Sequence, residues 1–155
     1  MSAALGARID ALDDADLVDV GGVGGTLAGN ALSLAAARAT LDEVLTAEAF
    51  DAMFALCDRF AAGVRGVLAD RDVPWSIVQL GARAELAFTA NPPRNGSASA
   101  ALHDAELEDA LHLFLLNRGV MITPFHNMAL MSPATTTADV DRHTEVFSEA
   151  VAALA

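Results

Sequence analysis

Apolar side chains recur at helical spacing through most of the chain. Between residues 47 and 70 they follow the i, i+3, i+4, i+7 pattern of an amphipathic helix. The apolar positions of that segment are Phe50, Met53, Phe54, Cys57, Phe60, Ala61, Val64 and Val67 or Leu68. The same periodicity predicts helices over residues 3–13, 31–45 and 104–117, and a final helix that starts at Thr137.

Polar residues stand where the N-caps of three of these helices are expected. Asn30, Asp104 and Thr137 carry side-chain oxygens that can accept a hydrogen bond from a free N–H of the first helical turn. Arg118 and Gly119 follow the predicted helix of residues 104–117, and a basic residue with a glycine commonly ends a helix. The final helix is expected to carry one apolar face, made of Val140, Phe147, Val151 and Leu154.

A shorter part of the chain has the pattern of β-strands. Pro74 ends the long helical segment, and the stretch from Trp75 to Phe88 reads as two strands joined near Gly81 or as one long bent strand. Residues 91–99 are rich in Pro, Asn, Gly and Ser and are expected to form a surface loop. Two further short strands, separated by a turn, are predicted over residues 120–123 and 129–131.

These elements predict an α+β fold in which helices pack on a small, mainly antiparallel sheet. The chain has 155 residues, 54% of them hydrophobic, which is enough for a real core. Its formal charge of −12 argues against nucleic acid and anionic membrane surfaces as partners. We expect a cytoplasmic protein, because no run reaches the roughly 20 apolar residues of a membrane span and no signal peptide is recognisable. The single Cys57 is expected to be an inert, buried thiol.

The glycine-rich stretch of residues 21–29 is the most informative chemical feature. Glycines free backbone N–H groups to point at an anion, and the positive end of the following helix dipole adds to this attraction. The nine residues counted as Lys or Arg are all arginines, so the chain lacks the lysine that a G-x-x-x-x-G-K-[ST] nucleotide loop needs. Gly25 and Thr26 are therefore candidates to bind a phosphate other than that of ATP, although a glycine cluster before a helix is more often a plain turn.

The residues around this loop resemble a known family. Residues 24–41, Gly-Gly-Thr-Leu-Ala-Gly-Asn-Ala-Leu-Ser-Leu-Ala-Ala-Ala-Arg-Ala-Thr-Leu, are similar to the G-T-x-x-G-N-P-L-x-x-A-A-x-x-A-x-L segment of class III aminotransferases, which include the glutamate-1-semialdehyde aminomutases. Residues 116–124 resemble the family's x-x-R-G-V-x-x-x-P segment, and residues 135–141 resemble the start of its last helix. Ala31 stands where the family usually has proline.

The resemblance implies a pyridoxal phosphate cofactor, whose phosphate Gly25 and Thr26 would bind in the active site of the neighbouring subunit of a homodimer. The family holds its cofactor on a lysine upstream of the loop, and this chain contains none, so we expect it not to be catalytically competent alone. By this resemblance, residues 1–45 are a remnant of the large cofactor-binding domain, with the phosphate loop and a linking helix. Residues 46–155 are the C-terminal α+β domain.

Two further residues are weaker candidates for substrate contacts. His126, in a turn between two predicted strands, can contact a substrate or relay a proton, or it can simply stabilise the turn. Arg83 can bind a substrate carboxylate through its planar guanidinium, or it can be a solvated or cross-strand partner. No metal site is expected, and the remaining histidines read as surface or packing residues: His103, His112 and His143.

Three functional hypotheses follow. The leading one is the C-terminal segment of a pyridoxal-phosphate-dependent aminotransferase or aminomutase that acts on an amino or keto acid and needs a homodimer partner or the missing N-terminal portion of the enzyme. The second is a noncatalytic binding or assembly domain that docks on a lysine-bearing partner. The third is an unrelated small protein that binds a phosphate metabolite with the same loop.

Overall fold

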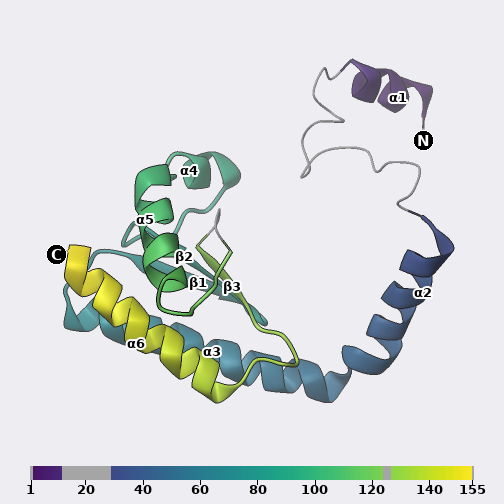
Figure 1. Cartoon of the computed structure of the whole chain (residues 1–155). Coiled ribbons are helices and arrows are strands. Elements are labelled where there is room, and N and C mark those ends of the chain that lie inside the picture. Colours follow the sequence, from purple (N-terminus) through teal and green to yellow (C-terminus); the bar gives the residue numbers. More distant parts are fainter. Residues whose placement is uncertain (1, 12–28, 124–126, 155) are drawn as a thin grey trace. The chain divides into compact units, whose positions relative to one another are not determined.

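The computed structural model describes residues 2–11, 29–123 and 127–154 (Figure 1). The chain divides into two compact units, Met1–Val44 and Leu45–Ala155. Among the described residues, every buried apolar side chain belongs to the second unit. None of the helices in the described ranges has the length and apolarity needed to cross a membrane.

The first unit contains helices that the sequence predicts. Helix α1 spans Ala3–Asp10, and α2 spans Ala31–Ala39. Asn30 caps α2, since its Oδ1 accepts a hydrogen bond of 2.9 Å from the Ser33 N–H. The chain then continues as a π-helical turn, η1, over Thr40–Val44 instead of as α-helix. The Thr40 hydroxyl donates to the Ala36 carbonyl at 2.9 Å, a bond that competes with the regular backbone ladder where the helix changes type.

The second unit is an α+β arrangement, as predicted. Its elements are α3 (Ala47–Asp70), β1 (Ser76–Leu80), β2 (Arg83–Ala87), α4 (Gly96–Ala100), α5 (Ala105–Leu116), β3 (Met128–Leu130) and α6 (Thr137–Leu154). The strands form one antiparallel sheet in the order β1-β2-β3. Gly81 has a φ of 58° between β1 and β2, so the two-strand interpretation of the segment after Pro74 is correct.

The core lies where α3 and α6, which pack side by side in Figure 1, meet α5 and one face of the sheet. Ile77, Ala84 and Ala129 face this core from three adjacent strands. The opposite face of the sheet carries Val78, Leu80 and Leu130, which remain exposed. Cys57 on α3 is fully buried, and burial raises the pKa of its thiol, which confirms the expectation of a buried thiol.

Two predictions about irregular segments are wrong. Residues 91–99 are not all loop, because α4 begins at Gly96 after Asn95, whose Oδ1 accepts a hydrogen bond of 2.8 Å from the Ala98 N–H. Residues 120–123 do not form a strand. The Val120 N–H is committed to the Leu115 carbonyl at the end of α5, and only Thr123 pairs across to Met128.

The cap of the final helix is Thr136 and not Thr137. The Thr136 Oγ1 accepts from the Asp139 N–H at 3.3 Å, while the Asp139 carboxylate accepts from the Thr136 N–H at 2.8 Å. This reciprocal capping box holds the pKa of Asp139 below its usual value. The predicted apolar face is buried at Val140, Phe147 and Val151, but Leu154, at the last residue of α6, is half exposed.

The capping box predicts which of two adjacent threonines stabilises the fold. Replacing Thr136 by alanine is expected to lower the free energy of unfolding by about 1 kcal/mol, because the first turn of α6 loses its hydrogen-bond acceptor. Thr137→Ala, one residue inside the helix, is the matched control and is expected to change stability by less than about 0.5 kcal/mol. Urea denaturation followed by far-UV circular dichroism compares the two variants. Equal effects would contradict the assignment.

His143 is a buried imidazole in the middle of the core. It is 6% exposed, and its ring lies 4.3 Å from the Phe60 ring and 5.7 Å from the Phe147 ring, measured between centroids. Its Nδ1 is buried without a hydrogen-bond partner among the described residues. Burial in this aromatic environment lowers the pKa of His143 from 6.5 to about 4, so the folded chain holds it neutral.

This pKa shift predicts a loss of stability on mild acidification. From pH 6.5 down to about pH 4 the unfolded chain binds a proton at His143 that the folded chain does not, so the free energy of unfolding falls. The loss is about 3 kcal/mol at its limit, from roughly 1.4 kcal/mol per pKa unit. His143→Phe should remove this part of the pH dependence, measured by urea denaturation at pH 7 and pH 4.5. The exposed-histidine variant His103→Gln should keep it, and an unchanged slope in His143→Phe would overturn the assignment.

Candidate functional site

Of the residues that the sequence predicts to bind a cofactor or a substrate, the structure describes only Arg83. Gly25, Thr26 and His126 lie outside the described residues, and their roles stay predictions. Arg83 lies on β2 with its side chain exposed, and its guanidinium forms an ion pair with Glu85 two residues along the same strand. The Arg83 side chain therefore already has a carboxylate partner on its own face of the sheet.

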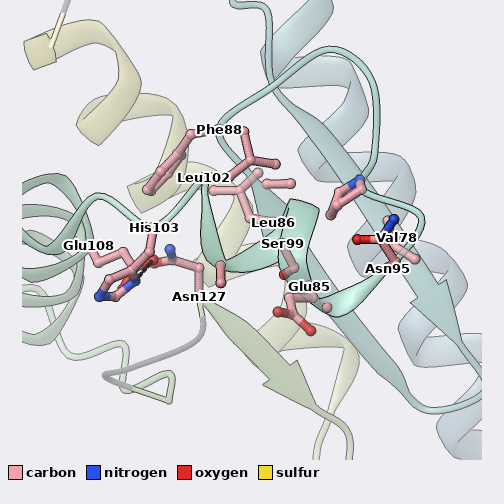
Figure 2. Close-up of a pocket in the computed structure, with 14 residues that line it drawn as sticks. Val78, Glu85, Leu86, Phe88, Asn95, Ser99, Leu102, His103, Glu108 and Asn127 are labelled. Carbon is pink, nitrogen blue, oxygen red and sulfur yellow. Dashed lines mark hydrogen bonds and ion pairs between the residues drawn. The ribbon is translucent and has the colours of Figure 1, made fainter.

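A pocket of about 660 Å³ lies next to this ion pair (Figure 2). It is formed by β2 and the segment that follows it, by α4 and by the start of α5. Glu85, the partner of Arg83, lines it, and so does Asn127, the residue after His126. The pocket therefore adjoins Arg83 through its partner Glu85, although Arg83 does not line it.

One side of the pocket is built at the start of α5. Asp104 caps that helix, since its Oδ1 accepts from the Leu107 N–H at 3.1 Å, as the sequence predicts. The cap places His103 just before the helix and Glu108 within its first turns. The His103 Nδ1 lies 3.1 Å from the Glu108 Oε1, and the two side chains are 57% and 12% exposed. A nearly buried carboxylate thus orients a more exposed imidazole.

Asn127 contributes an amide to the same side of the pocket, as Figure 2 shows. Its backbone has a φ of 42°, in the left-handed region that asparagine tolerates better than most residues. Its carbonyl accepts a hydrogen bond of 3.1 Å from the Leu86 N–H, which ties the residue to β2. Asn127 is 9% exposed, and its side chain makes no hydrogen bond to any residue that the structure describes.

Apolar side chains complete the pocket. Phe88, Leu86 and Leu102 line it between the polar groups (Figure 2). The ring of Phe88 is held in place by Trp75, with 4.8 Å between the ring centroids. The pocket therefore combines an apolar wall with a few polar groups, which is the usual composition of small-molecule sites.

A second hollow, of about 720 Å³, lies between α5, β3 and α6. Its most prominent charged group, Arg142, is already bonded to the Glu145 carboxylate and to the Arg118 carbonyl. The Nδ1 atoms of its two histidines, His112 and His143, are covered by neighbouring atoms. The charged side chains of this hollow, Arg142 and Asp139, are therefore already bonded within the fold.

Sequence reasoning missed the polar groups of the pocket. It assigned His103 to the surface or to packing, and it gave no role to Glu108 or Asn127. The pairing of His103 with Glu108 has a readable signal, because residues on either side of a helix N-cap are brought together by the first turn. Asn127 has no such signal, since its position depends on the pairing of distant strands.

The fold is shared with transaminases of known structure. An omega-transaminase from Sphaerobacter thermophilus is similar over 89% of this chain and 32% of its own, with a TM-score of 0.67 and 22% identity, a level that speaks for the fold alone. No family model matches the chain.

Glutamate-1-semialdehyde aminomutases are similar in sequence as well. Glutamate-1-semialdehyde 2,1-aminomutase 2 of Brevibacillus brevis is 33% identical over 129 residues, which are 82% of this chain and 30% of that protein. An aminomutase from Pseudomonas aeruginosa, whose structure was solved in complex with PMP, is 46% identical with a TM-score of 0.80, over 89% of this chain and 30% of its own. The resemblance to class III aminotransferases is confirmed, and the chain spans about 30% of the length of these relatives.

The described residues do not by themselves make a site for pyridoxal phosphate. They include no lysine to hold it covalently. The residues that line the pocket at His103 include the carboxylates of Glu85 and Glu108 and no arginine, which disfavours a phosphate group there. The loop with Gly25 and Thr26 lies outside the described residues. We therefore assign no cofactor chemistry to this pocket.

The left-handed backbone at Asn127 predicts a difference in stability between two variants that both lack its side-chain amide. Asn127→Ala and Asn127→Gly both remove the amide, but alanine in the left-handed region is strained, so Asn127→Ala should be less stable by about 1 kcal/mol. Ala62 is an exposed helical position on α3, and there the order should reverse. Ala62→Gly should lower the free energy of unfolding relative to the unchanged chain. Urea denaturation measures all three variants. A more stable Asn127→Ala would contradict the left-handed conformation.

Proposed function

We propose that this chain is the C-terminal segment of a pyridoxal-phosphate-dependent class III aminotransferase or aminomutase that acts on an amino or keto acid. One observation carries this proposal: 46% identity across 89% of the chain with the Pseudomonas aeruginosa aminomutase, at a TM-score of 0.80. Identity at that level extends the likeness beyond fold. The enzyme would work in the cytoplasm, as the composition of the chain suggests.

In the assembled enzyme, Gly25 and Thr26 would bind the cofactor phosphate across a dimer interface. The motif in residues 24–41 and the anion-binding chemistry of a glycine-rich loop before α2 support this role. The lysine that holds the cofactor would come from another segment, because this chain has none. Residues 1–45 would be the part of the large domain that carries the loop, and residues 46–155 the C-terminal domain.

A second candidate function is a noncatalytic assembly domain that docks on a lysine-bearing partner. The specific observation in its favour is the surface of α2 and η1, which bury none of their residues. Leu32 is 80% exposed and Leu41 is 66% exposed on this helical stretch. Such apolar surface is characteristic of segments that another polypeptide covers.

A complementation experiment tests the leading proposal. The chain is co-expressed with the Pseudomonas aeruginosa aminomutase from which the matching segment has been deleted. We expect a complex that retains pyridoxal phosphate after dialysis, seen as visible absorbance, and that regains aminomutase activity. Thr26→Ala should weaken cofactor binding about tenfold or more, because a hydrogen bond to a charged phosphate is lost.

Thr137→Ala, remote from the loop in sequence, is the matched control and should leave cofactor binding unchanged. The chain alone should not retain the cofactor. Visible absorbance that survives dialysis of the chain alone would contradict the proposal that the lysine must come from elsewhere. A complex that forms without cofactor or activity would favour the assembly domain, and no complex at all would count against both.

A further inference from the structure

The charge of the pocket at His103 defines what it can bind. Glu85 and Glu108 line it, and its described lining includes no arginine, although Glu85 is paired with Arg83 outside the lining. The chain has no lysine, so His103 is the only group in this lining that can carry a positive charge, and it is already paired with Glu108. Carboxylates repel an anionic ligand and attract a cationic one.

Glu108 has unused capacity for hydrogen bonds. Its side chain is only 12% exposed, and its one partner among the described residues is His103. An ionised carboxylate offers about four lone-pair sites, so the pairing with His103 does not exhaust its capacity to accept hydrogen bonds. Because a nearly buried charge is costly when its hydrogen bonds are not satisfied, a donor from a ligand would stabilise it.

Asn127 supplies a second acceptor on the same side. The residue is 9% exposed, lines the pocket, and has a side-chain amide that is unpartnered within the part of the chain that the structure describes. Its amide oxygen accepts hydrogen bonds, and a primary ammonium group donates them and accepts none. A primary ammonium group with three N–H donors therefore matches Glu108 and Asn127 together.

The rest of the pocket suits a hydrocarbon body. Phe88, Leu86 and Leu102 line it next to the polar groups (Figure 2). Its volume of about 660 Å³ is in the range of small-molecule sites.

We propose that this pocket binds a small primary amine in its ammonium form, with the ammonium group held by Glu108 and Asn127 and the carbon body packed on Phe88 and Leu102. The ligand class is an alkylammonium or arylalkylammonium compound without a carboxylate next to the amine, because the nearby Glu108 carboxylate repels a negative group. The site needs neither the cofactor nor the lysine that the proposed enzyme requires, so it can be tested on this chain alone.

Isothermal titration of the full chain with n-hexylammonium tests the proposal, with hexanoate as the probe of opposite charge. We expect saturable binding of hexylammonium and at least about tenfold weaker binding of hexanoate. Butylammonium, two methylene groups shorter, should bind about tenfold more weakly than hexylammonium, from roughly 0.8 kcal/mol for each buried methylene.

Glu108→Gln removes the charge and should weaken hexylammonium binding about tenfold or more. The matched control is Glu106→Gln, at an exposed position on the same first turn of α5, which should leave hexylammonium binding unchanged. His103→Ala frees the Glu108 carboxylate and should retain binding or strengthen it, which separates the role of the charge from a general loss of folding. Circular dichroism checks that each variant is folded.

Three results would overturn the proposal. One is no saturable binding of hexylammonium below about 10 mM. Another is equal affinity for hexanoate and hexylammonium, which would indicate an apolar groove without charge selection. The third is equal binding by folded Glu108→Gln and Glu106→Gln. None of these results bears on the complementation experiment, so the amine site and the proposed enzyme can fail independently.

Discussion

The close approach of α3 to α6 is the contact on which the rest of the second unit depends. A Cβ atom at Gly63 on α3 would lie 2.5 Å from the Thr144 Oγ1 on α6, closer than real Cβ atoms come to other atoms. Glycine therefore lets the two helices meet at this point. Their packed pair brings Val64, Val146 and Phe147 into the centre of the core, against which α5 and the inner face of the sheet are laid. The pocket at His103 is positioned by the same arrangement, because β2 and α5 both pack on that core.

Local signals in the sequence predict both ends of the long helix α3, although two of its predicted apolar positions, Phe50 and Phe54, are exposed. Thr46 caps its first turn, the apolar pattern runs to Leu68, and Pro74 lies beyond its end, so both boundaries match the prediction. The wrong predictions concern places where two neighbouring residues or segments can play the same local role. Thr136 and Thr137 are equally good caps in isolation, and only the pairing with Asp139 selects Thr136. Residues 120–123 have β-branched and apolar side chains, but the end of α5 takes the backbone groups that a strand would need.

The candidate site divides in a similar way. The phosphate loop at Gly25 and Thr26 can be read from the chain because a glycine-rich motif is contiguous and resembles a family segment. The pocket cannot be read in that way, since it joins residues of β1, β2, α4 and α5 with Asn127, which precedes β3. Its composition becomes apparent only when the strands are in register. Arg83 shows the limit of a single-residue argument, because a partner two positions away on the same strand decides what its guanidinium contacts.

The contact between Trp75 and Phe88 gives this protein a built-in optical reporter. Trp75 is the only tryptophan in the chain, and its ring packs on Phe88, which also lines the pocket. Intrinsic fluorescence therefore originates at one known point, a single ring away from the pocket. Any occupant that moves the Phe88 ring changes the surroundings of that indole, without the need for an attached dye.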